Sequence, residues 1–281
     1  MVSSLGRFIW YELTTTDVAA AAAFYTKVIG WGAQDVSAPG RPYVLFTAGK
    51  DLVSGAMELP EDARKTGATP CWVGYVGVDD VDAAADRVKR LGGTLYVPPM
   101  EIPDISRFAV FADPQSAALA MSKSLSRDQA QPADTNAPGR VCWNELFAAD
   151  WEKAWAFYGA IFDWEKGDAD VDATGTYQLF CAGGQAIGGM LTKPPTAPAP
   201  FWLYYFNVDD IDAAAKRVEA GGGRVLAGPL EMRGGSWVIQ CTDPQGAIFA
   251  LEGTRKNDGI GFFVRTTPRD PSDARSRRWS W

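Results

Sequence analysis

The sequence predicts an α+β fold that is built from four βαβββ units. Two observations support this prediction: long internal repeats divide the chain into two similar halves, and a strand, a helix and several short strands follow one another twice within each half. The chain has 281 residues, enough for about two domains that each bury a core of their own.

Two pairs of segments carry the repeat. Residues 7–31 and 140–164 are identical at ten of 25 positions, and residues 72–88 and 202–218 at eleven of 17. The tripeptide Asp-Pro-Gln also occurs once in each half. A duplication of this length predicts two modules of the same fold, packed about a pseudo-two-fold axis.

Each βαβββ unit is expected to open with a strand and a helix. In FIWYELTTT the residue types alternate as they do in a strand, and Asp17 and Gly30 then suit the N-cap and the C-terminal end of a helix. In the second unit CWVGYVGV predicts the strand, and Asp80 and Gly92 bracket the helix.

Short strand-like segments follow each helix. Gly and Pro separate them, and the Asp113-Pro114 pair suits a type I turn. In the first half they are YVLFTA (43–48), SGAMEL (54–59), TLYVPP (94–99), RFAVFA (107–112) and AALAMS (117–122).

The repeat also sets the expected domain boundaries. The first module is predicted over residues 1–122 and the second over 140–253, joined by an aperiodic, polar, Pro-containing linker over 123–139. The tail over 254–281 lies outside the repeat. It is either disordered or a strap docked through Trp279 and Trp281, and we favour the strap because exposed tryptophans are costly in water.

Composition excludes several classes of function. The formal charge is 27 − 34 = −7, which argues against non-specific nucleic-acid binding, and no apolar run is long enough for a membrane span. The chain contains no histidine. Catalysis through a Ser-His or Cys-His pair is therefore excluded, as are metal sites built on imidazole.

The cysteines carry little signal for function. Cys71, Cys142, Cys181 and Cys241 are isolated in the sequence, so no C-x-x-C motif indicates a zinc ribbon or a redox centre. Four cysteines in a chain of this length are too sparse for a secreted disulfide framework. We expect buried thiols in a cytoplasmic protein.

The motifs resemble those of the vicinal oxygen chelate superfamily, which includes glyoxalase I, extradiol dioxygenases and bleomycin and fosfomycin resistance proteins. The resemblance rests on FYTKVIGW and FYGAIFDW at the helix ends, VDDVDAA and VDDIDAA, and DPQSAALAM and DPQGAIFAL. The WYEL and WNEL openings look most like two-module, glyoxalase-like proteins. The resemblance implies that paired βαβββ units curl their sheets into half-open barrels, each around a cavity.

The same resemblance implies where metal ligands would lie. The family places His, Gln or Glu at three inward strand positions in each module, whereas this chain has apolar residues there. They are Trp10, Val73 and Ala120 in the first module and Trp143, Leu203 and Ala250 in the second. No cofactor is therefore expected; the alternative is Mg²⁺ or Mn²⁺ held by carboxylates.

Strand alternation then predicts what lines the cavities. Side chains two residues apart share a face, so Glu12, Glu145 and Glu252 should point inward, with Ser122 at the position equivalent to Glu252. Glu12 and Glu145 are the catalytic candidates, because burial raises the pKa of a carboxyl group. The predicted ligand-binding residues are Trp10, Trp143, Trp72, Trp202, Glu252 and Ser122.

Three functions remain open at this point. The first is binding of a small organic molecule, aromatic or cationic, by a metal-free protein, as in bleomycin resistance. The second is a glyoxalase-like lyase, isomerase or dioxygenase with a carboxylate-held metal. The third is a scaffold without a site. No nucleic-acid or membrane partner is expected, and the chain is expected to be a monomer or a homodimer.

Overall fold

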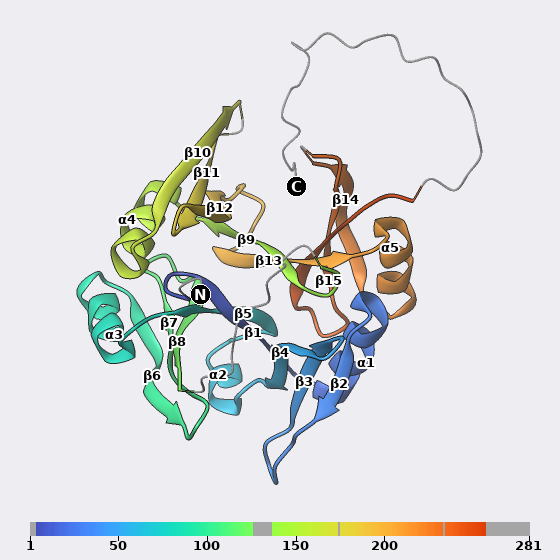
Figure 1. Cartoon of the computed structure of the whole chain (residues 1–281), viewed down its shortest axis with the longest axis horizontal. Helices are drawn as coiled ribbons and strands as arrows, with labels where there is room; N and C mark the ends of the chain where they lie inside the picture. Colours follow the sequence, from blue (N-terminus) through green and yellow to red (C-terminus); the bar gives the residue numbers. More distant parts are fainter. Residues whose placement is uncertain (1–3, 126–136, 174, 233, 257–281) are drawn as a thin grey trace.

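The computed structural model describes residues 4–125, 137–173, 175–232 and 234–256 (Figure 1). The fold is α+β, with two modules that each contain two βαβββ units and one eight-stranded mixed sheet. The first module comprises β1 (Phe8–Thr15), α1 (Val18–Ile29), β2 (Gly32–Asp35), β3 (Tyr43–Ala48), β4 (Asp51–Glu58), α2 (Glu61–Lys65), β5 (Cys71–Gly77), α3 (Val81–Arg90), β6 (Thr94–Ile102), β7 (Ser106–Ala112) and β8 (Ala118–Ser124).

The second module repeats this order without a counterpart of the five-residue α2. Sequence periodicity did not predict α2, because it buries no residue. The elements are β9 (Val141–Ala148), α4 (Trp151–Phe162), β10 (Glu165–Asp172), β11 (Gly175–Ala182), β12 (Gln185–Thr192), β13 (Phe201–Val208), α5 (Ile211–Ala220), β14 (Arg224–Glu231), β15 (Trp237–Thr242) and β16 (Ile248–Gly253).

An aspartate caps the start of each of the four long helices. The carboxylate of Asp17 accepts a hydrogen bond from the backbone N–H of Ala20, and those of Asp80, Asp150 and Asp210 do the same for their helices. These carboxylates satisfy N–H groups that have no partner within the helix, which is why the sequence located the helix starts correctly.

The first two βαβββ units form one sheet and the last two form the other. The strand orders are β2-β3-β4-β1-β5-β8-β7-β6 and β10-β11-β12-β9-β13-β16-β15-β14, and neither sheet closes on itself within the described residues. In each sheet the opening strands of its two units, β1 with β5 and β9 with β13, pair antiparallel at the centre. This answers the question, left open by the sequence, of which units pair.

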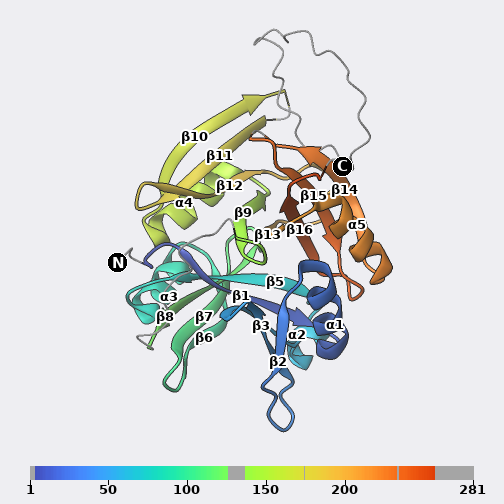
Figure 2. The same cartoon turned by 45° about the vertical axis from the view of Figure 1, so that its right-hand side comes forward.

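Reciprocal contacts join the two modules. Helix α1 contacts α5 and helix α3 contacts α4, so these helices lie side by side in both views (Figure 2). The indole N–H of Trp31 donates to the carbonyl of Gly139 at 2.8 Å, and that of Trp164 to the carbonyl of Gly6 at 2.6 Å. Each bond is repeated with the modules exchanged, as in an isologous dimer.

A buried polar pair accompanies each of these contacts. The hydroxyl of Tyr25 donates to Asp243 at 3.0 Å, and that of Tyr158 donates to Asp113 at 3.1 Å. Both aspartates belong to the repeated Asp-Pro-Gln motif, so the duplicated turn of each module holds the other module in place.

Three further expectations concern the linker, the tail and the cysteines. Strand β8 continues through Ser124, into the predicted linker, and residues 126–136 lie outside the described residues. The proposed strap falls on residues 257–281, which are also outside them. All four cysteines are free thiols, but only Cys241 is buried; the prediction of burial is wrong for the other three, which are half-buried.

Candidate functional site

Each sheet buries apolar side chains on both of its faces. One face packs against the helices and the other module in a continuous core, and we call the opposite face the inner face. A separate apolar cluster covers each inner face. On the first sheet it consists of Ile9, Trp10, Cys71, Val73, Tyr75, Phe108, Val110 and Ala120, and on the second of Cys142, Trp143, Phe147, Leu191, Phe201, Leu203, Tyr205, Leu230, Val238, Ile248 and Ala250.

On the first inner face two tyrosines hold one carboxylate. Glu12 lies two residues from Trp10 on β1, and each of its carboxylate oxygens accepts one hydrogen bond. The hydroxyl of Tyr43 donates to Oε1 and that of Tyr75 to Oε2, both at 2.7 Å. A half-buried charge needs such partners, and two of its approximately four lone-pair positions stay available for a ligand.

A glycine allows Tyr43 to reach this carboxylate. Gly55 pairs with Glu12 across β4 and β1, and a Cβ atom at Gly55 would lie 2.2 Å from the hydroxyl oxygen of Tyr43. The phenol ring therefore lies over a position that only glycine leaves open. Gly189 has the same relation to Tyr177 in the second module, where the corresponding distance is 2.3 Å.

The second inner face repeats the carboxylate–phenol pair. The hydroxyl of Tyr205 donates to Oε2 of Glu145 at 2.6 Å, as Tyr75 does to Glu12. The indole N–H of Trp143 donates to the hydroxyl oxygen of Tyr177 at 2.8 Å. Glu145 is only 5% exposed and Tyr205 only 3%, so this carboxylate–phenol pair is shielded from water.

The phenols act as fixed donors. Burial, and then the adjacent carboxylate, raise the pKa of Tyr75 beside Glu12 and the pKa of Tyr205 beside Glu145 well above the ordinary tyrosine value. Both hydroxyl groups therefore keep their protons at neutral pH. The catalytic role of Glu12 and Glu145 stays a prediction, and their position on the inner faces agrees with strand alternation.

Two further predicted residues lie on the inner faces and differ between the modules. The hydroxyl of Ser122 donates to the backbone carbonyl of Arg107 at 3.3 Å, within its own sheet. Glu252, its counterpart, accepts from the thiol of Cys142 at 3.4 Å. Burial and the Glu252 charge raise the pKa of Cys142, so this residue stays a thiol.

Trp72 and Trp202 do not line the inner faces. Both are buried in the helix-side core, where their indole N–H groups donate to Tyr25 and Tyr158 at 2.9 and 3.2 Å. The reason is alternation along β5 and β13: the neighbouring Val73 and Leu203 face inward, so the two tryptophans face the helices. We therefore withdraw these two residues from the ligand-binding set.

The inner faces do not fit the metal centre that the fold family uses. Val73 and Ala120 lie in the same cluster as Trp10, and none of these three side chains offers an oxygen or nitrogen atom to a metal. The protonated phenols are poor metal ligands. Within the described ranges no three His, Cys, Asp or Glu side chains are grouped closely enough to hold an ion.

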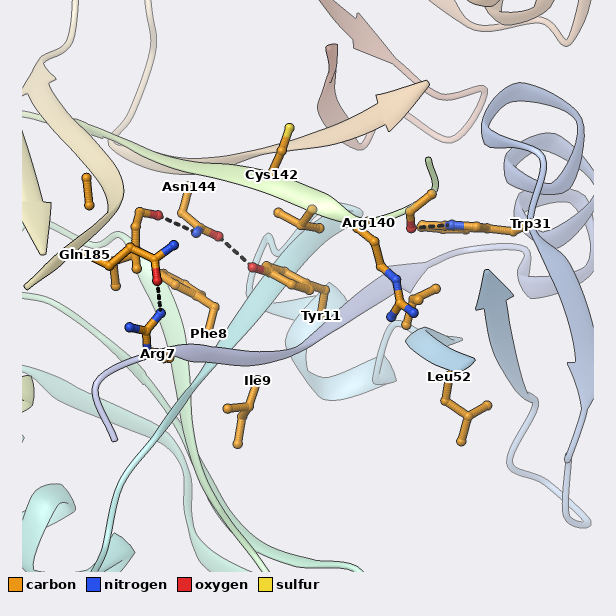
Figure 3. A pocket seen from close by; sticks show the side chains of 15 residues that line it. Arg7, Phe8, Ile9, Tyr11, Trp31, Leu52, Arg140, Cys142, Asn144 and Gln185 are labelled. Atoms are coloured by element: carbon orange, nitrogen blue, oxygen red, sulfur yellow. Dashed lines mark hydrogen bonds between the residues drawn. The ribbon is translucent and has the colours of Figure 1, made fainter. Parts of the chain in front are cut away.

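A cleft between the modules is the other candidate site (Figure 3). The hydroxyl of Tyr11 donates to Asn144 at 2.8 Å across it, and Arg7 donates to Gln185 at 2.9 Å. Arg140 pairs with Asp51. The cleft holds about 120 Å³, well below the roughly 300 Å³ of a typical organic-ligand pocket, and its polar groups are already paired with one another.

Sequence reasoning missed four residues of the inner faces, Tyr43, Tyr177, Gly55 and Gly189. A signal for the tyrosines was present, because YVLFTA and YQLFCA share four of six residues. The glycines had no comparable signal, since their role depends on a ring that comes from the neighbouring strand.

Comparison with known proteins identifies the fold. The family model described as Glyoxalase/Bleomycin resistance protein/Dioxygenase superfamily matches residues 7–120 and 140–251. A manganese-bound glyoxalase from Novosphingobium aromaticivorans has a TM-score of 0.63 at 16% identity and covers 90% of this chain and 83% of its own. The 2,3-dioxygenase LapB from Pseudomonas sp. KL28 has a TM-score of 0.62 at 12% identity, covering 91% and 94%.

Relatives of higher identity match along most of the chain. The putative glyoxylase CFP32 of Mycobacterium tuberculosis is 34% identical over 244 residues, covering 86% of this chain and 92% of that protein. The anthracycline biosynthesis protein DnrV of Streptomyces peucetius is 32% identical over 254 residues, covering 86% and 91%. No helix in the described part of the chain could cross a membrane. The chain belongs to the glyoxalase/bleomycin resistance protein/dioxygenase superfamily.

Proposed function

We propose that the protein binds a flat, partly apolar small molecule on the inner faces of its two sheets. The ligand carries a hydrogen-bond donor or a cationic group, which the carboxylate of Glu12 or Glu145 accepts. The observation that carries this proposal is the repeat, in both modules, of a tyrosine-held carboxylate inside an apolar and aromatic cluster.

The chemistry of the two faces supports such a ligand. The ring faces of Trp10 and Trp143 attract planar and cationic groups, and the apolar clusters around them supply most of the contact area. Two relatives are named anthracycline biosynthesis proteins. An anthracycline carries a planar anthraquinone within its tetracycle and an amino sugar, so it combines both features.

A metal-dependent lyase, isomerase or dioxygenase is the rival function. It requires ligand atoms that the inner faces lack at the family's positions, where Val73, Ala120, Leu203 and Ala250 stand. We therefore propose a binding protein that needs no metal ion to hold its ligand. Elemental analysis that finds about one Mg, Mn, Zn or Fe per chain, lost in a Glu12→Gln or Glu145→Gln variant, would overturn this choice.

The test compares two planar probes. 2-Hydroxyanthraquinone carries a phenol donor, and 9,10-anthraquinone lacks it. The experiment is run at mildly acidic pH, where the probe keeps its phenol proton. The indole N–H signals of Trp10 and Trp143 in NMR spectra report on the two inner faces separately, so each titration yields one dissociation constant per face.

Charge removal should weaken binding of the donor probe only. Glu12→Gln and Glu145→Gln keep the side-chain shape, and each should cost about 1.5–3 kcal/mol of binding free energy on its own face, the scale of a hydrogen bond to a charged group. The exposed Glu152→Gln on α4 is the control. If the carboxylates only hold the fold, the variants will lower the melting temperature and leave both affinities unchanged.

A further inference from the structure

One row of side chains crosses both inner faces in the same register. It runs over four neighbouring strands, and successive members are direct cross-strand partners. The row is Trp10, Tyr75, Ala120 and Val110 in the first module and Trp143, Tyr205, Ala250 and Gln240 in the second. Three positions are identical in the two modules, and the fourth exchanges a valine for a glutamine.

Gln240 is fully enclosed and unpaired. Its exposed fraction is 0%, and neither Nε2 nor Oε1 has a hydrogen-bond partner among the described residues. It shares its face with Val238, and its amide lies close enough to the hydroxyl of Tyr205 to interact with it, without meeting the geometry of a hydrogen bond. A buried amide without a partner destabilises a fold. Val110 shows that the same position accepts an apolar residue, so packing does not require the amide.

The other donors on this face already have acceptors. The hydroxyl of Tyr205 donates to Glu145, the indole of Trp143 to Tyr177 and the thiol of Cys142 to Glu252. Of the two N–H groups of Gln240, at most one is directed to the Tyr205 hydroxyl, so a donor remains available. The two carboxylates on this face, Glu145 and Glu252, are acceptors. An acceptor group of the ligand therefore has the Gln240 amide as its donor.

We propose that Gln240 is a specificity-determining residue, which makes the second module select planar ligands that carry a carbonyl oxygen. Its N–H group donates to that oxygen while Glu145 holds the ligand's donor group. The first module has Val110 at the equivalent position and does not distinguish ligands with a carbonyl oxygen from ligands without one. This inference rests on the proposed function and gives the two modules different ligand preferences.

The experiment exchanges the differing residue between the modules. Gln240→Val and Val110→Gln are each titrated with 2-hydroxyanthraquinone and with 2-hydroxyanthracene, which has the phenol but no carbonyl. The indole N–H signals of Trp10 and Trp143 again give one dissociation constant for each inner face. Thermal denaturation of both variants monitors folding, and the fold should tolerate Gln240→Val because it removes an unpaired buried amide.

The two probes should respond differently. Gln240→Val should weaken binding of 2-hydroxyanthraquinone to the second face roughly tenfold, the scale of one neutral hydrogen bond. It should leave the affinity for 2-hydroxyanthracene unchanged. Val110→Gln should give the first face the same preference. Binding that requires Glu145 but ignores Gln240 would overturn this inference alone. No binding of either probe to the unmodified protein would overturn the proposed function and this inference together.

Discussion

The two modules share a fold and a carboxylate–phenol pair, yet their inner faces differ in polarity. The first combines Glu12 with apolar neighbours and Ser122, whereas the second adds Gln240, Cys142 and Glu252 to the equivalent Glu145. Duplication fixed the backbone of both modules. Several of the side chains that differ between the modules lie on the inner faces.

The interface between the modules contains a set of symmetric contacts. Trp31 and Trp164 donate to equivalent backbone carbonyls, and Tyr25 and Tyr158 to equivalent aspartates. Each of these residues packs against the other copy, so a change in one module alters the surroundings of the other. These four contacts are therefore symmetric, whereas other contacts between the modules are not: Tyr11 and Asn144 occupy equivalent positions of the repeat and bond to each other.

The largest expected effect tests the symmetry of the interface. Trp31 and Trp164 are 5% and 4% exposed, and Trp31→Ala and Trp164→Ala should each lower the free energy of unfolding by about 3–5 kcal/mol, because each leaves a cavity and an unpaired carbonyl. The two losses should agree within about 1 kcal/mol, given comparable surroundings. Chemical denaturation measures both, with the exposed Glu152→Gln as the control. A large difference between the two losses would show that the two modules do not contribute equally to the interface.

A smaller effect separates the two inner faces. Gly55→Ala and Gly189→Ala should destabilise the protein by about 1–3 kcal/mol each, because the new Cβ atom collides with the ring of Tyr43 or Tyr177. Each should weaken probe binding on its own face and leave the other unchanged. A double-mutant cycle with Tyr43→Ala or Tyr177→Ala provides the check, since removal of the ring should cancel the cost of the methyl group. Additive losses would contradict this explanation.

The smallest expected effect concerns pH. Burial raises the pKa of Asp113 and of Asp243 above the ordinary aspartate value of about 3.9. The folded state then binds protons more tightly than the unfolded state, so this contribution to stability is present at low pH. It is lost as pH rises from the unfolded pKa through the higher folded pKa. Both aspartates should contribute with the same sign.

Asparagine variants isolate that contribution. Relative to Asp113→Asn and to Asp243→Asn, the unmodified protein should lose stability as pH rises across the acid range. Denaturation midpoints measured at a series of pH values for the three proteins supply the comparison. A gain of stability with rising pH would mean that hydrogen bonds to the carboxylates outweigh burial.

Local sequence determined much of the fold. The aspartate caps and the short strands follow from residue types that act within a few positions of one another, and the duplication follows from comparing the two halves of the chain. The structure confirms an α+β fold with two glyoxalase-like modules. The position of Glu12 beside Trp10 also follows from local sequence, because side chains two apart on a strand share a face. The same holds for Glu145 beside Trp143.

The tertiary structure decided how the aromatic residues of β5 pack. Alternation from Val73 turns Tyr75 to the inner face and Trp72 to the helices, so the prediction of Trp72 as a ligand-binding residue disagreed with that alternation. Packing against the helices placed Trp72 in the core. The contact of Tyr43 with Glu12 over Gly55 joins three strands, and the missing partner of Gln240 depends on several strands at once. Such features arise only when the strands are paired in register, because local sequence does not specify which residues become neighbours.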